Sequence, residues 1–301
     1  MNVIETHGLT KRYGATRALR DCTLAVPAGY LAALVGANGA GKTTLLNMLA
    51  GLITPTDGTA TVLGDQAPGS PAALNGIAFV AQDAPVYKNL SVADMLHLTR
   101  NLNWSFDLRQ ARARLADLGI PLKKKAGQLS GGQQSQLALT LALARRPRLL
   151  ILDEPLSGLD PLARRDFITT VLTAMADDGL SVLLSSHSLP ELDRVADYLI
   201  VLSRSRLQVA GELDDLSARH RVLTGPAAEA DSRARQWRVI QDQRAEAQAH
   251  LLVEISGPSE GPVPPGWESH PVSSEELMLA YLRAPGSAAP LQSIELTEAA
   301  R

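Results

Sequence analysis

The chain has 301 residues, of which 45% are hydrophobic and 20% charged, so it can bury a full core and is not disordered. Its 29 Lys and Arg against 31 Asp and Glu give a formal net charge of −2, which provides no overall attraction to nucleic acid or an anionic membrane. One cysteine, Cys22, excludes an intramolecular disulfide and a multi-cysteine metal site.

The sequence predicts neither a signal peptide nor a membrane-spanning segment. Residues 1–7 hold no basic segment followed by an apolar stretch, so the sequence predicts no signal peptide. The richest apolar stretch, Leu137 to Ala144, is much shorter than the roughly 18 residues that a bilayer span needs. We therefore expect a soluble protein that reaches a membrane only through a partner.

The first two thirds of the chain alternate short β-like runs with helical segments. This pattern is typical of an α/β domain with a mainly parallel sheet. Continuous apolar runs at 31–35, 149–152 and 182–184 predict strands that are covered on both faces. From 92 to 118 the pattern is helical without strands, which predicts an inserted helical lobe that we place at about 83–145.

The composition changes after Leu216, and we expect residues 216–301 to form a small α+β accessory region. In chain order, its predicted parts are strands at 237–240 and 251–255, a proline-rich linker at 257–266, a short helix from Ser274 and a loosely ordered tail from Ala284.

A phosphate-binding loop follows the first apolar strand. It consists of Gly36, Ala37, Asn38, Gly39, Ala40, Gly41, Lys42, Thr43 and Thr44, and it fits the pattern G-x-x-x-x-G-K-[ST]. The glycines let successive N–H groups face one concavity, and the helix that begins near Lys42 adds partial positive charge. We expect Lys42 to reach the β- and γ-phosphates and the Thr43 hydroxyl to ligate Mg²⁺. A purely structural glycine turn would not require Lys-Thr at this offset.

The strand at 149–152 ends on two carboxylates, Asp153 and Glu154. Ligands bind at this edge in open α/β sheets. We expect Asp153 to support Mg²⁺ through water and Glu154 to polarise the water that attacks the γ-phosphate. Alone, such a pair would be interpreted as the cap of the next helix, but the phosphate loop favours the catalytic interpretation.

Two further polar residues, Gln82 and His187, also follow predicted strands. His187 is a candidate for contacting the γ-phosphate and orienting Glu154, and the alternative is a packed or surface histidine. Gln82 is a candidate Mg²⁺ ligand, and the alternative is a side chain that faces solvent. The sequence alone leaves both alternatives open.

A second glycine-rich helix start lies about twenty residues before the carboxylate pair. It consists of Leu129, Ser130, Gly131, Gly132 and Gln133, called the signature below, and it leads into an apolar helix. The Ser130 hydroxyl and the glycine N–H groups suit a phosphate, but the first loop already holds one. The economical interpretation is that the signature caps the ATP bound by another subunit.

The order and spacing of these elements resemble the nucleotide-binding subunits of ABC transporters over about residues 2–215. The resemblance rests on Tyr13, the phosphate loop, Gln82, the signature, Asp153-Glu154, Ser157 to Asp160 and His187. It implies an ATP hydrolase that uses ATP and Mg²⁺. The implied fold is a P-loop NTPase core of ABC type, with a mainly parallel sheet, an antiparallel N-terminal β part and the helical lobe. We therefore expect an ATPase domain at 1–215 and the accessory region at 216–301.

The resemblance also implies partners. Two ATPase subunits, identical or different, would form a head-to-tail dimer with two ATP molecules at their interface. Tyr13 would stack on adenine, although an exposed tyrosine before the turn at Gly14 is the alternative, and Asp160 would carry signals across the dimer. The helical lobe would hold a groove for a coupling helix of a transmembrane permease. The protein would then be cytoplasmic, at the inner face of the cell membrane, with no nucleic-acid partner.

Two questions remain about function. The separate chain and its C-terminal extension resemble the exporter branch that handles drugs, peptides or lipids. The alternative is a soluble ABC ATPase that acts on nucleic acid or ribosomes. Such relatives carry two motif sets, a long coiled coil or cysteine zinc modules, whereas this sequence has one motif set, no extended heptads and a single cysteine. The accessory region would be either a regulatory module or a packing extension.

Three segments depart from the pattern of that family. Gln134-Ser135-Gln136 follow the signature where basic residues are usual, Leu156 stands where a small hydroxyl residue is common, and Arg204-Ser205-Arg206 replace a glycine-containing turn. We expect the first departure to affect local packing rather than chemistry. The three lysines at 123–125 are interpreted as a solvated face without a binding function.

Overall fold

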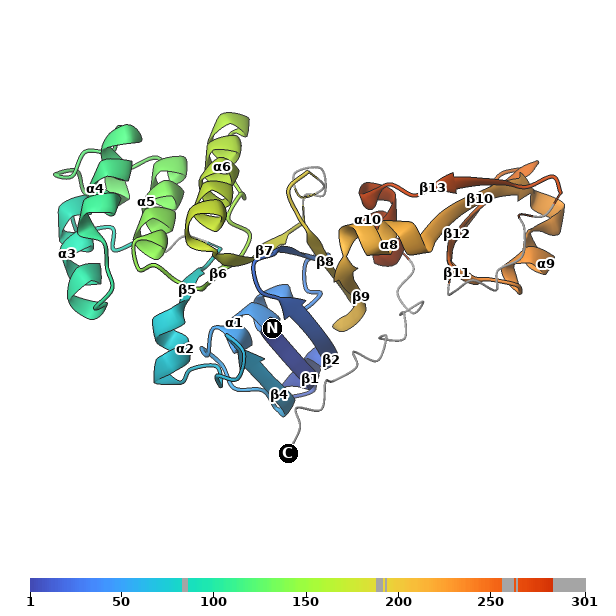
Figure 1. The fold of residues 1–301 in the computed structure, drawn as a ribbon, viewed down its shortest axis with the longest axis horizontal. Coiled ribbons are helices and arrows are strands. Elements are labelled where there is room, and N and C mark those ends of the chain that lie inside the picture. The colour runs from blue at the N-terminus through green and yellow to red at the C-terminus, as the bar shows by residue number, and fades with distance from the viewer. Residues whose placement is uncertain (83–85, 188–191, 193, 256–262, 264, 284–301) are drawn as a thin grey trace.

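The computed structural model describes residues 1–82, 86–187, 192, 194–255, 263 and 265–283. Figure 1 shows three parts along the long axis of the molecule. A helical lobe lies at one end, a sheet flanked by helices lies in the centre with a second sheet beside it, and a small separate sheet lies at the other end.

The central sheet has six strands in the order β5-β6-β7-β3-β8-β9. Their bounds are β3 Leu31–Val35, β5 Ile77–Val80, β6 Leu149–Leu152, β7 Ser181–Ser186, β8 Tyr198–Ser203 and β9 Arg206–Glu212. All neighbours pair in parallel except β8 and β9, which are antiparallel. Every residue of β3, β6, β7 and β8 is buried, as expected for strands with both faces covered. The predicted α/β class with a mainly parallel sheet is confirmed.

The N-terminal part forms a three-stranded antiparallel sheet in the order β2-β1-β4. Its strands are β1 Asn2–Tyr13, β2 Thr16–Pro27 and β4 Asp57–Val62. This sheet and the central sheet share a core with helix α1, Lys42–Leu49, whose Leu45, Leu46 and Leu49 are fully buried. Because these side chains pack in the core that the two sheets share, the start of α1, and therefore the phosphate loop, is held against both sheets.

The helical lobe contains α3 Val92–Leu102, α4 Leu108–Asp117, the 3₁₀ helix η1 Ala126–Gln128 and α5 Gly131–Leu143. Its α-helices begin at side-chain caps, Ser91 and Ser130 as capping boxes and Asp107 as a single cap. Helix α5 packs on two cores: Leu137 and Leu141 belong to the core of the lobe, whereas Leu139 and Ala142 belong to the core of the central sheet. Thus α5 joins the lobe to the sheet.

Two further helices flank the central sheet. They are α2 Pro71–Gly76 and α6 Pro161–Asp178. Helix α6 begins at Asp160, whose carboxylate accepts a hydrogen bond from the N–H of Ala163 at 2.9 Å, and it ends at Gly179 in the left-handed conformation. Its Phe167 and Val171 are fully buried against the central sheet.

The C-terminal part is a four-stranded antiparallel sheet in the order β11-β12-β10-β13. Its elements are α8 Leu213–Arg219, β10 His220–Pro226, η2 Ala227–Glu229, α9 Ala230–Ala234, β11 Arg238–Arg244, β12 Gln248–Glu254, β13 Glu268–Pro271 and α10 Ser274–Arg283. The strands predicted at 237–240 and 251–255 overlap β11 and β12, and the helix predicted from Ser274 is α10. Most of the predicted linker and the tail from Ala284 lie outside the described residues.

Helix α10 attaches this small sheet to the central sheet. Leu277, Met278 and Tyr281 are buried in the same core as Leu199 and Val201 of β8. Ser273 caps the helix, since its hydroxyl accepts the N–H of Glu276 while the Glu276 carboxylate accepts the N–H of Ser273. The helix α8 spans the predicted boundary at 215/216, so the chain passes between the two parts inside a helix.

No helix among the described residues is both long and apolar enough to span a membrane.

A buried histidine links α8, β10 and α10. His220 has no exposed surface, and its Nδ1 and Nε2 lie 2.6 Å from the Leu216 carbonyl oxygen and 2.9 Å from the Tyr281 hydroxyl. Burial lowers the pKa of His220 from its ordinary value, although the bond to the Leu216 carbonyl acts in the opposite direction. The folded protein therefore favours the neutral imidazole at this junction.

We expect the C-terminal sheet to lose stability as the pH falls below about 6.5, the ordinary pKa of histidine. The unfolded chain takes up a proton at His220 more readily than the folded one, so the contribution of His220 is fully present above that pH and declines below it. Urea unfolding near about pH 7.5 and about pH 5.5 measures the effect in a Trp104→Phe background, where fluorescence reports Trp237 and Trp267.

Two variants separate this effect from general acid sensitivity. His220→Gln should reduce the pH dependence, whereas His97→Gln, which removes an exposed histidine of α3, should leave it unchanged. An equal pH dependence in the parent and in His220→Gln would contradict the assignment.

Candidate nucleotide-binding site

The phosphate loop runs from the end of β3 to the start of α1. Gly41 precedes α1 with a φ of 105°, and a Cβ there would lie 2.5 Å from the carbonyl oxygen of Ala18. A Cβ at Gly36 would lie 2.7 Å from the carbonyl oxygen of Leu202. Only glycine fits these positions. No side chain caps α1, so its first N–H groups are available to an anion.

The other loop residues are distributed around this concavity. Ala37, Asn38 and Gly39 are exposed, and Ala40 is buried beneath them. Thr43 is exposed and Thr44 half-buried in the first turn of α1. The loop therefore presents backbone groups and a hydroxyl at the surface, above a helix whose inner face is anchored in the core.

Lys42 lies inside the loop, with only 6% of its surface exposed. Its Nζ donates a hydrogen bond to the Gly36 carbonyl oxygen at 2.8 Å and lies 3.1 Å from Glu154 Oε1. The ammonium group thus connects the phosphate loop with the end of β6.

The two carboxylates after β6 are held by β7. In the parallel register Leu152 pairs with Leu184, so Asp153, the residue after β6, comes beside Ser185. The Ser185 hydroxyl donates to Asp153 Oδ1 and accepts from the N–H of Glu154, both at 2.8 Å. Glu154 has a φ of 49°, a left-handed conformation that costs an L-residue about 1–2 kcal/mol. This bridge fixes both the carboxylate pair and the strained backbone.

His187 follows β7 directly and completes the contacts of Glu154. Its Nδ1 is hydrogen-bonded to Glu154 Oε2, and 57% of its side chain is exposed. The two oxygens of Glu154 therefore contact different groups, Lys42 on one side and His187 on the other. Of the alternatives for His187, the geometry favours the one that orients Glu154.

The remaining candidates lie at the edges of this centre. Gln82 is exposed just beyond β5, where the Asp153 N–H donates to the Val80 carbonyl oxygen at 2.9 Å. Tyr13 is 51% exposed at the end of β1, with Lys11 Nζ 5.2 Å from its ring centroid. Asp160 caps α6.

The signature lies apart from the phosphate loop. Ser130 and Gln133 form the capping box of α5, and Gly131 is exposed with open space where a Cβ would lie. Among the described residues, no hydrogen bond or ion pair joins 129–133 to 36–44. Within one chain the structure therefore brings together Lys42, Asp153, Glu154 and His187, but not the signature.

A metal ion would depend on the nucleotide as well as on protein groups. In the described part of the chain, no three His, Cys, Asp or Glu residues gather as a metal site. The candidates Thr43, Gln82 and Asp153 supply hydroxyl, amide and carboxylate oxygens. These donors fit Mg²⁺, which keeps several waters and is usually held by one or two carboxylates together with phosphates.

Sequence reasoning missed Ser185, which makes two of the hydrogen bonds at this centre. The available signal was the polar pair Ser185-Ser186 at the end of an apolar strand. Nothing in the sequence assigned β7 as the neighbour of β6, so the partner of the carboxylates could not be named.

Comparison with known proteins agrees with this geometry. Residues 19–157 match a family model described as "ABC transporter". The chain is 35% identical over 246 residues to the daunorubicin/doxorubicin resistance ATP-binding protein DrrA of Streptomyces peucetius, covering 79% of this chain and 74% of that protein. The chain belongs to the ATP-binding subunits of ABC transporters.

Other comparisons support this family and its ATP hydrolase class. The Fe(3+) ions import ATP-binding protein FbpC of Pseudomonas fluorescens is 38% identical over 220 residues, which cover 70% of this chain but only 62% of that relative. A solved structure entitled "Structure of ATP binding subunit of ABC transporter" has a TM-score of 0.65 and 27% identity, covering 72% of this chain and 92% of that one. Residues 125–194 also match a model described as "AAA domain, putative AbiEii toxin, Type IV TA system". The predicted family is confirmed. The relatives of this ABC subunit include both an importer and a resistance protein, so the comparisons do not assign a direction of transport.

Replacing Ser185 with alanine should destabilise the protein by roughly 1–3 kcal/mol, because the Glu154 N–H and an Asp153 oxygen lose a buried partner. Urea unfolding measures this loss. ATP turnover should also fall, by roughly tenfold to a hundredfold, because Glu154 is no longer held in position.

Ser181→Ala is the matched control. Ser181 is buried at the opposite end of the same strand, where its hydroxyl accepts the Gly29 N–H at 2.8 Å. It should lose comparable stability and keep its turnover. A parallel loss of turnover in both variants would show that stability alone accounts for the effect of Ser185.

Proposed function

We propose that this chain binds ATP with Mg²⁺, hydrolyses it as a head-to-tail dimer and powers a separate transmembrane permease. The observation that carries the proposal is the pair of contacts on Glu154, which joins Lys42 of the phosphate loop to His187 after β7. A buried carboxylate held at both oxygens beside an uncapped helix start suits the activation of a water molecule next to a phosphate.

Each residue of the centre then has a defined task. The N–H groups at the start of α1 and the Lys42 ammonium hold the phosphates, and Glu154 takes the proton of the attacking water. His187 keeps Glu154 oriented, and Tyr13 offers its exposed ring to adenine. Thr43, Gln82 and Asp153 would hold Mg²⁺, which when bound offsets the negative charge of the phosphates.

The exposed start of α5, at Ser130 and Gly131, supports the dimer. The start of α5 combines the Ser130 hydroxyl with the backbone of Gly131, a residue with open space around it. Such a helix start binds an anion, and the phosphate loop of the same chain is elsewhere. We therefore assign the signature to the ATP of a second subunit, identical or different. Asp160, which follows the Glu154 segment and starts α6, would connect the two sites.

We further propose export as the direction of transport. The match to the resistance protein DrrA covers 79% of this chain, which is more than the share that residues 1–215 make up, so it reaches into the proposed accessory region at 216–301. The match to the iron importer covers 70% of this chain, which the proposed ATPase domain can accommodate by itself. In this proposal the chain lies in the cytoplasm against the inner face of the membrane, with the helical lobe towards the permease.

The Glu154→Gln variant tests the reaction. It should still bind ATP but turn it over roughly 10²–10⁴-fold more slowly, the usual contribution of a positioned acid–base group. Size-exclusion chromatography with ATP should show the variant as a stable dimer. Glu246→Gln, in the exposed turn between β11 and β12, is the control and should behave as the parent. Normal turnover in Glu154→Gln would remove Glu154 from its role.

Gly131→Asp tests the signature. The added carboxylate favours the start of α5 through the helix dipole, and a Cβ at Gly131 meets no atom of its own chain within 4 Å. It would nevertheless repel a phosphate of the second subunit, so hydrolysis should be lost while a monomer binds ATP as before. Gly131→Asn is the uncharged control of the same size. If Gly131→Asp weakened ATP binding by the monomer, the signature would belong to the site of its own chain.

A further inference from the structure

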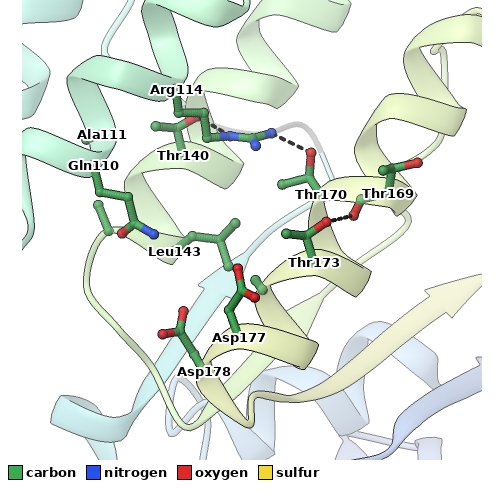
Figure 2. A pocket seen from close by; sticks show the side chains of 12 residues that line it. Gln110, Ala111, Arg114, Thr140, Leu143, Thr169, Thr170, Thr173, Asp177 and Asp178 are labelled. Carbon is green, nitrogen blue, oxygen red and sulfur yellow. Dashed lines mark hydrogen bonds between the residues drawn. The ribbon is translucent and has the colours of Figure 1, made fainter.

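Arg114 of α4 joins three helices at a cleft of about 320 Å³ between α4, α5 and α6 (Figure 2). Its Nη2 donates hydrogen bonds to Gln136 Oε1 and Thr170 Oγ1, both at 2.8 Å, and its Nε donates to Thr140 Oγ1 at 3.1 Å. Gln136 and Thr140 belong to α5, and Thr170 belongs to α6. One guanidinium group thus ties the helical lobe to a helix of the central domain.

All three acceptors of Arg114 are neutral. Burial lowers the pKa of Arg114, with the Asp117 carboxylate acting in the opposite direction. Among the described residues no carboxylate forms an ion pair with Arg114, so this partly buried cation depends on the number and geometry of its hydrogen bonds. Gln136 and Thr140 are 6% and 1% exposed, so they too would lose buried partners if α4 and α5 moved apart. The tie therefore favours one arrangement of the three helices.

The position of this tie bears on the signature. Gln136 and Thr140 are six and ten residues along α5 from Ser130, which corresponds to about 9 and 15 Å at 1.5 Å per residue. A tilt of α5 by about 10° around these points would move the signature by about 2 Å, and such displacements can cost a hundredfold in rate. Helix α6, which holds Thr170, begins at Asp160 in the segment that follows Glu154.

We propose that Arg114 is a positioning residue of the ATPase, which fixes the angle between α5 and α6 and so places Ser130 and Gly131 against the ATP of the second subunit. The inference rests on the proposed head-to-tail dimer. Arg114 does not contact the phosphate loop, so its loss affects turnover and ATP-dependent dimerisation while the binding of ATP to a monomer is retained.

Exchanging the donor and the acceptor tests the proposal. Arg114→Gln should lower kcat by about 10–100-fold, while the Kd for ATP of the monomer changes by less than about twofold. The double variant Arg114→Gln/Gln136→Arg restores one guanidinium and one amide to the same junction, so kcat should return to within about threefold of the parent. Arg112→Gln, which removes an exposed arginine from the same helix, is the control and should keep the parental kcat.

Two results would overturn the inference. One is an unchanged kcat in Arg114→Gln, and the other is a loss of kcat matched by an equal loss of ATP-binding sites and not restored in the double variant. The second result would make Arg114 a purely structural residue. If Arg114→Gln does not fold, Arg114→Lys decides instead, because a single ammonium keeps the charge but cannot reproduce the planar arrangement of three bonds. It should show the same loss of kcat, and full activity would overturn the inference.

The test separates this inference from the proposed function. With Arg114 intact, a Glu154→Gln chain that stays monomeric in ATP and a Gly131→Asp chain that hydrolyses normally would contradict the dimer itself. An ATP-induced dimer of Glu154→Gln that is lost on adding Arg114→Gln, and regained on adding Gln136→Arg, supports both.

Discussion

The left-handed backbone of Glu154 is the constraint on which the site depends. An L-residue adopts this conformation only where its surroundings compensate for the strain. Here the parallel register of β6 and β7 brings Ser185 beside the carboxylate pair, and its hydroxyl binds Asp153 and the Glu154 backbone at once. The side chain of Glu154 is consequently directed between Lys42 and His187. The phosphate loop, β6 and β7 therefore act as one unit at a single edge of the sheet.

The position of the signature depends on two other kinds of interaction, apolar packing and the hydrogen bonds of Arg114. Helix α5 starts at the signature and packs on two hydrophobic cores, that of the helical lobe and that of the central sheet. Apolar packing is not directional and permits small tilts of a helix, whereas the hydrogen bonds of Arg114 to Gln136, Thr140 and Thr170 are directional. The two together explain how an exposed helix start could be presented to a second subunit in a defined position.

The C-terminal part is continuous with the rest of the molecule. Helix α10 and the buried His220–Tyr281 pair place the small antiparallel sheet against β8 and α8, in the same core as the central sheet. The accessory region and the central domain therefore share one hydrophobic core. Its hydrogen-bonded His220, whose pKa is lowered by burial, adds a sensitivity to acid.

The sequence by itself determined the local elements. The apolar run 31–35 became β3 and the run 149–152 became β6, with the bounds expected, because a strand covered on both faces needs a continuous apolar segment. The phosphate loop could be identified because glycine, lysine and threonine are required at fixed positions. The tertiary structure alone decided which strands are neighbours and which side chains meet. Ser185 lies 31 residues from Glu154 and Arg114 lies 22 from Gln136, and such pairings are set by the register of a sheet and the packing of helices, which leave no local pattern in the chain.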